Sequence, residues 1–85
     1  MIMTPPPSYV VSYIHHPEKV ARKLDRDLAD KYPGDTISSI CHTTHNPRKD
    51  YCSVTDYAGN GVSYEFQYTI RISKDGSSFK YWITQ

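Results

Sequence analysis

Two cysteines and two histidines lie close together in the middle of the sequence, and their side chains are the most reactive ones it offers. They are Cys41, His42, His45 and Cys52. Thiols and imidazoles bind zinc, and they also serve as nucleophile and base in covalent catalysis. The intervening Asn46-Pro47 favours a turn. A hairpin centred on Asn46-Pro47 places Cys41 directly across from Cys52, at a separation that suits a disulfide.

Three states are open for these cysteines. Two free thiols are the default in a reducing cytosol, a disulfide is the second state, and zinc binding is the third. Cys41, His45 and Cys52 are weak zinc candidates that would need a fourth ligand such as His15, and their spacing matches no standard zinc motif. We therefore predict no cofactor and no metal.

The same residues give little support to catalysis. Neighbours in a strand point to opposite faces, so Cys41 cannot easily meet His42, and a pairing of Cys41 with His45 across a bend is the remaining option. Thiols acting as small core residues, with histidines on the surface, are the simpler interpretation. The sequence therefore predicts a protein that is not an enzyme.

A second group of residues depends on the stretch from Val62 to Ser73. Every even position there is apolar or aromatic and every odd one is polar, which is typical of a strand with one buried face. Lys74-Asp75-Gly76-Ser77 then closes a hairpin. A two-residue type I′ turn at Asp75-Gly76 pairs apolar positions throughout, whereas a three-residue turn does not. The predicted pairs are Ile72 with Phe79, Ile70 with Tyr81, and Tyr68 with Ile83.

In this register Trp82 lies opposite Thr69 on the solvated face, and Arg71 lies opposite Lys80. Trp and Arg dominate binding hot spots, and adjacent like charges favour an acidic neighbour. The predicted binding residues are Trp82, Arg71, Lys80, Gln67, Thr69 and Thr84. The alternative to a binding role is structural: a terminal segment or a second subunit covers Trp82. The same cluster also suits a phosphate and a base of nucleic acid in place of an acidic protein surface.

One helix and several shorter strands must position these residues. A helix is expected from about Pro17 to Tyr32, ended by Pro33-Gly34, with an apolar stripe at helical spacing. The stripe comprises Val20, Ala21, Leu24, Leu28 and Tyr32. Strands are expected at Tyr9–Ile14, at Thr36–Thr44 and at Tyr51–Tyr57. The last of these is followed by a turn and then by the long strand from Val62.

Two of these strands are poorly specified. Ile37 and Ile40 have opposite parity, which indicates a bulge or an edge position for their strand. In the next strand an Asn60-Gly61 turn makes Tyr57 face Tyr64. A three-residue turn brings Cys52 and Val54 to the buried face instead, and the sequence leaves the choice open.

The predicted fold is α+β, with one helix packed on a four- to five-stranded antiparallel sheet in the order β-α-β-β-β-β. This order resembles that of cystatins, whose sheet wraps one helix. The cystatin inhibitory loop, Gln-x-Val-x-Gly, is replaced at its position by His45-Asn46-Pro47-Arg48, so protease inhibition does not carry over. Residues 1–8 are expected to form a flexible arm, and residues 9–85 a single domain.

Composition narrows the function. The chain has 85 residues and a net charge of +1, from ten Lys and Arg against nine Asp and Glu, without the basic excess of most nucleic-acid binders. No apolar run is long enough to span a membrane, and the N-terminus lacks the apolar core of a signal peptide, so a cytoplasmic location is expected.

The favoured function is therefore a small protein-binding module or inhibitor that acts through an exposed sheet face or an edge strand. Its expected partner is another protein, with an acidic surface. Pairing of two copies along an edge strand, which gives a homodimer, is a further expectation. The alternatives are a single-stranded nucleic-acid-binding domain and a thiol- or zinc-dependent domain.

Overall fold

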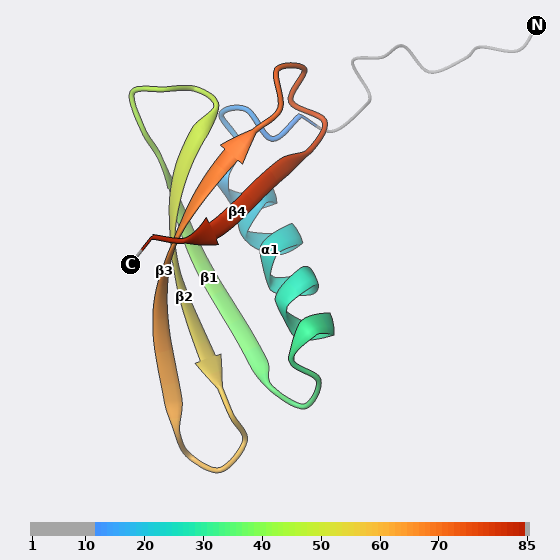
Figure 1. Cartoon of the computed structure of the whole chain (residues 1–85), viewed down its shortest axis with the longest axis vertical. Helices are drawn as coiled ribbons and strands as arrows, with labels where there is room; N and C mark the ends of the chain where they lie inside the picture. The colour runs from blue at the N-terminus through green and yellow to red at the C-terminus, as the bar shows by residue number, and fades with distance from the viewer. Residues whose placement is uncertain (1–11, 85) are drawn as a thin grey trace, which may run out of the picture.

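The computed structural model describes residues 12–84, which form one helix and four strands. Helix α1 spans Pro17–Lys31. Strands β1 (Thr36–Thr43), β2 (Lys49–Tyr57), β3 (Ser63–Ile72) and β4 (Phe79–Ile83) form one antiparallel sheet in the order β1-β2-β3-β4. The helix lies along one face of this sheet (Figure 1), which confirms the α+β class with one helix and four strands. We call the helix side the inner face and the other side the outer face.

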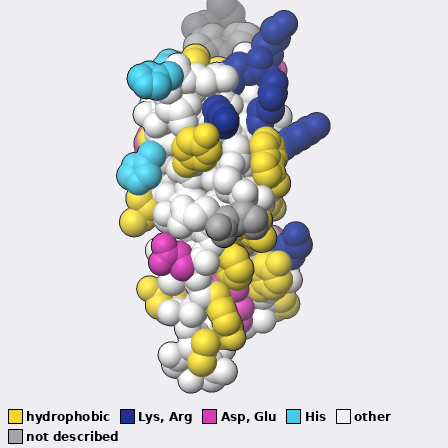
Figure 2. All heavy atoms as spheres, turned by 60° about the vertical axis from the view of Figure 1, so that its left-hand side comes forward, with side chains coloured by type: hydrophobic (Ala, Val, Ile, Leu, Met, Phe, Trp, Pro, Cys, Tyr) yellow, Lys and Arg dark blue, Asp and Glu magenta, His cyan; other side chains and the backbone are white. Residues whose placement is uncertain are grey.

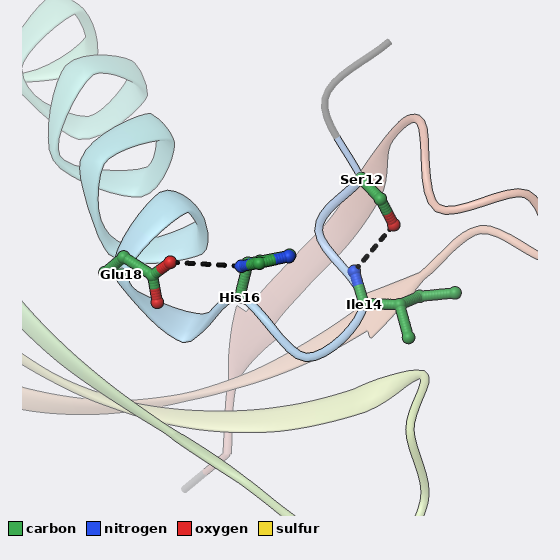
Figure 3. Close-up of polar contacts among 4 residues, drawn as sticks. All are labelled: Ser12, Ile14, His16 and Glu18. Carbon is green, nitrogen blue, oxygen red and sulfur yellow. Dashed lines mark hydrogen bonds and ion pairs between the residues drawn. The ribbon is translucent and has the colours of Figure 1, made fainter. Parts of the chain in front are cut away.

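The predicted strand before the helix is wrong for Ser12–Ile14, which have no strand structure. The Ser12 hydroxyl accepts the Ile14 N–H at 3.2 Å (Figure 3), and this local bond competes with strand pairing. His15, which follows, has a φ of 63°. Tyr13 instead donates its backbone N–H to the Gly76 carbonyl at 2.8 Å. The order is therefore helix then four strands in the described residues, and the cystatin-like order is not confirmed. Residues 1–8 and Tyr9–Val11 lie outside the described residues.

The helix begins at Pro17, as predicted, because proline suits a first-turn position where its missing N–H is not needed. Glu18 lies in the first turn, and its carboxylate is 3.2 Å from the Nδ1 of His16 (Figure 3). Val20, Leu24 and Leu28 are buried against the sheet, so they form the core side of the predicted stripe. The opposing core residues are Cys52, Val54, Tyr68, Ile70 and Ile72.

The hairpin of β3 and β4 has the predicted register but a different turn. Ile72 pairs with Phe79, Ile70 with Tyr81, and Tyr68 with Ile83. The loop contains four residues, because Ser73 N–H bonds the Ser78 carbonyl at 2.8 Å and Gly76 N–H bonds the Ser73 carbonyl at 3.0 Å. Only Gly76 in this loop has a positive φ, at 78°, whereas a type I′ turn needs two such residues.

The Asp75 side chain explains the wider loop. Its Oδ1 accepts hydrogen bonds from the Ser73 hydroxyl at 2.7 Å and from the Ser77 hydroxyl and N–H at 2.8 and 3.0 Å. The Ser77 N–H and the two hydroxyls hold the pKa of Asp75 at about 2. The hydrogen bonds that this carboxylate accepts take the place of the backbone hydrogen bonds of a two-residue turn.

The loop of β2 and β3 settles the register that the sequence left open. Ala58 N–H bonds the Val62 carbonyl at 3.0 Å, which closes a three-residue loop of Gly59, Asn60 and Gly61. Cys52 and Val54 therefore lie on the inner face, and so do Asp50 and Asp56, which are also buried. The alternate residues of β2 lie on the outer face.

Strand β1 occupies an edge of the sheet. It pairs with β2 without interruption from Thr36 to Thr43, so the parity mismatch does not come from a bulge. Ile37 packs against the core, whereas Ile40 lies on the outer face and is 62% exposed.

Candidate functional site

The outer face carries two adjacent cross-strand rows of functional side chains. In the first row Lys49 pairs with Arg71, and Arg71 pairs with Lys80. In the second row Tyr51 pairs with Thr69, and Thr69 pairs with Trp82. The rows are two residues apart along each strand, or about 7 Å. A line of cations therefore runs beside a line that begins and ends with an aromatic ring.

Trp82 points away from the helix because it pairs with Thr69, whose side chain is on the opposite face from those of Tyr68 and Ile70. Its side chain is 47% exposed. A pocket of about 210 Å³ lies beside it, lined by Asn46, Arg48, Lys49, Thr69, Arg71 and Trp82. In Figure 2 the molecule is rotated so that the side of the sheet opposite the helix comes forward. Lys and Arg side chains gather in the upper part of this view, next to hydrophobic side chains.

The pocket has a strongly positive rim. Arg48 is fixed by its Nε, which donates to the Ile72 carbonyl at 3.0 Å, and the ammonium of Lys49 lies 5.2 Å from the centre of the Tyr51 ring. The ion pairs within residues 12–84 are His16–Glu18 and Lys23–Asp27, so no carboxylate there pairs with Arg48, Lys49, Arg71 or Lys80. Charges arranged this way favour an anionic ligand.

The structure brings some of the predicted binding residues together and separates others. Trp82, Arg71 and Thr69 line one pocket, whereas Lys80, which lies opposite Arg71, lines a second pocket that shares Arg71 with the first. Thr69 is only 5% exposed, contrary to its predicted solvent position, because it lies between Tyr51 and Trp82 and its hydroxyl is 2.6 Å from that of Thr84.

Gln67 takes part in a different contact. Its side-chain oxygen accepts from the Ser53 hydroxyl at 3.0 Å, and its amide nitrogen donates to Glu65 at 3.4 Å. It is not among the residues that line the pocket beside Trp82. Thr84 is exposed at the end of β4, with its N–H bonded to the Gln67 carbonyl at 2.8 Å.

Sequence reasoning missed Asn46, Arg48, Lys49 and Tyr51. Asn46 and Arg48 belong to the β1–β2 loop. Lys49 and Tyr51 belong to β2, so their place on the outer face depends on the three-residue loop that the sequence left undecided. A three-residue turn, which puts Cys52 and Val54 on the inner face, also puts Lys49 and Tyr51 on the outer face. Following that alternative through the strand is how the sequence could have identified Lys49 and Tyr51.

The cysteines are resolved as a disulfide. Cys41 and Cys52 pair directly across β1 and β2, with Cα atoms 4.0 Å apart, and their sulfurs are bonded. The free-thiol state is therefore wrong, and neither sulfur is left as a zinc ligand or a nucleophile. Residues 12–84 contain no group of three His, Cys, Asp or Glu side chains that could hold a metal.

Comparison with models of known protein families, with curated proteins and with solved structures finds no match to this chain. In the described part of the chain, no helix has the length and apolar character needed to cross a membrane.

Proposed function

We propose that this chain is a small, non-enzymatic protein-binding module that captures an acidic segment of another protein on its outer sheet face. The observation that carries this proposal is the row of Lys49, Arg71 and Lys80 beside the row that ends in Trp82. Trp and Arg are the residue types that dominate the centres of protein interfaces. The carboxylates of the partner would pair with cations that have no ion pair within residues 12–84.

The pocket beside Trp82 supports this assignment. An apolar or aromatic side chain of the partner fits against the indole, while neighbouring acidic side chains reach Arg71 and Lys49 at the rim. Action as an inhibitor is one form of such binding, in which the captured segment belongs to an enzyme.

Single-stranded nucleic acid is the second candidate. Tyr51 and Trp82 offer two exposed rings in one row, with cations in the adjacent row, and this combination also suits stacked bases and their phosphates. The overall charge of +1 weighs against it, because most nucleic-acid binders carry a clear basic excess.

The test titrates the chain into two fluorescently labelled probes and follows their anisotropy, because Trp82→Ala removes the single tryptophan. The probes are a peptide of alternating Glu and Phe, and a single-stranded oligothymidylate. We expect the peptide to bind and Trp82→Ala to weaken it by about 30-fold, the loss of a hot spot worth about 2 kcal/mol. Tyr57→Ala is the matched control, because Tyr57 is an exposed aromatic at the far end of β2. An oligonucleotide that binds more tightly than the peptide, with steep salt dependence, would favour the second candidate. Binding of neither probe at low salt would contradict both.

The sequence analysis also predicts a cytoplasmic location and a homodimer formed through an edge strand. Disulfides persist in oxidising compartments, so the Cys41–Cys52 bond argues against the cytoplasm. Thiol blocking before extraction from the native source, followed by intact mass, decides whether the bond is present there. Sedimentation of the purified chain tests whether two copies pair along a strand edge.

A further inference from the structure

A small groove lies on the inner face of the sheet, away from the pocket beside Trp82. The hairpin of β2 and β3 extends past the end of α1 (Figure 1), so the helix does not cover its far part. Tyr64 and Phe66 are consequently exposed although they lie on the face that the helix covers farther along. The groove has a volume of about 140 Å³ and is lined by Leu28, Tyr32, Ile37, Val54, Asp56, Phe66, Tyr68 and Ile83.

One carboxyl group stands out among these apolar and aromatic walls. Asp56 is only 8% exposed, and its Oδ1 has no hydrogen-bond partner among residues 12–84. The neighbouring Asp35 carboxyl group, and to a smaller extent burial, raises the pKa of Asp56. No Lys, Arg or His within residues 12–84 forms an ion pair with either carboxyl group. A buried carboxyl group that lies next to a second, partly exposed one is costly unless a cation or a shared proton satisfies it.

We propose that this groove binds a small organic amine, with its apolar stem between Val54, Phe66 and Ile83 and its ammonium group beside Asp56 and Asp35. The walls match an apolar stem, and the two carboxyl groups supply a negative charge that no Lys, Arg or His of residues 12–84 neutralises. Tyr32 and Tyr68 present aromatic rings in the same groove, and such rings attract an ammonium group.

The volume limits the size of the ligand. A cavity of about 150 Å³ with apolar walls holds a single benzene molecule in another protein, so this groove accommodates one ring or a short aliphatic chain. Drug-sized molecules need pockets of roughly 300 Å³ or more. An amine with one ring is therefore the class of ligand that matches both the volume and the charge.

The test uses 2-phenylethylamine, with its uncharged analogue 2-phenylethanol as the matched probe. Both are titrated into the ¹⁵N-labelled chain at pH 7, with binding followed by amide chemical shifts. We expect the amine to shift residues around Val54, Phe66 and Ile83 and to bind at least tenfold more tightly than the alcohol. Asp56→Asn should remove most of that preference, whereas Asp30→Asn, on the exposed side of α1, should retain it.

Several results would overturn the proposal: equal binding of amine and alcohol, an amine preference that survives Asp56→Asn, shifts confined to the outer face, or no shifts up to millimolar probe. If Asp56→Asn does not fold, Asp35→Asn takes its place, since it removes the other half of the carboxyl pair. Trp82→Ala should leave amine binding unchanged, so failure here and failure of the proposed function are distinguishable.

Discussion

Arg71 and Lys80 lie directly opposite each other on β3 and β4, and no carboxylate of residues 12–84 forms an ion pair with either. Like charges in opposite positions destabilise a pair of strands. Lys49 adds a third cation on the other side of Arg71. This row is unfavourable for the isolated sheet and becomes favourable when an anion lies over it, which links the local electrostatics to binding.

Replacing Lys80 with Glu separates these two effects. We expect Lys80→Glu to stabilise the hairpin by about 0.5 kcal/mol, because opposite charges then face each other across the strands. The same change should weaken binding of an acidic peptide, since one cation of the row is lost. Urea denaturation measures the first effect and peptide titration the second. Lys74→Glu, in the loop beyond the strands, is the control, and equal peptide affinity in both variants would contradict the assignment.

The disulfide should contribute measurably to stability. Cys41 and Cys52 are 11 residues apart in sequence, and a cross-link that closes a loop of similar length stabilises by about 3 kcal/mol in the chain-entropy model. We expect the double variant Cys41→Ser and Cys52→Ser to lose about this amount in urea denaturation. Wild-type protein in excess dithiothreitol should match the double variant. A loss below about 0.5 kcal/mol would show that the cross-link does not limit the unfolded chain.

Asp50 should make the protein less stable near neutral pH. It is 1% exposed, and its Oδ2 has no hydrogen-bond partner in the described part of the chain. Burial raises the pKa of Asp50, although the charge of His15 opposes the shift. When the pKa of a carboxyl group is higher in the folded protein than in the unfolded chain, the protonated form favours folding. This contribution to stability is lost as the pH rises through the pKa of the folded protein. We therefore expect Asp50→Asn to stabilise the protein at pH 7 by about 1 kcal/mol.

The gain from Asp50→Asn should shrink as the pH falls and disappear below the unfolded value of 3.8, where both states carry the proton. Urea denaturation from pH 3 to pH 8 measures this dependence. Asp30→Asn, at an exposed position, serves as the control. A pH-independent gain from Asp50→Asn would assign the effect to packing and not to the buried charge.

Gly76 should be intolerant of a side chain for two reasons. Its φ of 78° suits glycine, and a Cβ there would clash with the Ser12 hydroxyl and lie 3.4 Å from Ile14 Cδ1. Gly61 has a similar φ of 84°, but a Cβ there would meet no atom of residues 12–84 within 4 Å, so Gly61→Ala carries only the conformational cost of about 1 kcal/mol. We expect Gly76→Ala to destabilise by at least about 1 kcal/mol more, measured by thermal denaturation. Equal losses would mean that residues 12–14 do not pack on this loop in solution.

The sequence by itself determined the helix and the β3–β4 pairing. Val20, Leu24 and Leu28 define one helical stripe, and Ile72, Ile70 and Tyr68 have a single parity that matches only one pairing with Phe79, Tyr81 and Ile83. Burial of apolar residues on one face is a strong constraint there, because a one-residue shift would expose the whole set. The position of Trp82 on the outer face follows from that pairing. The place of Cys41 across from Cys52 follows in the same way from the turn at Asn46-Pro47.

Only the tertiary structure decided which face of β2 is buried. Tyr51 and Tyr57 on one parity compete with Cys52 and Val54 on the other, so hydrophobic burial gives no clear preference from sequence. Packing beneath α1 favours the smaller side chains of Cys52 and Val54, and the register that buries them goes with the three-residue loop at Gly59 to Gly61. This one choice places Lys49 and Tyr51 beside Arg71 and Trp82, and it buries Asp50 and Asp56. Both proposed binding sites therefore depend on side-chain volume under the helix, which strand periodicity alone does not specify.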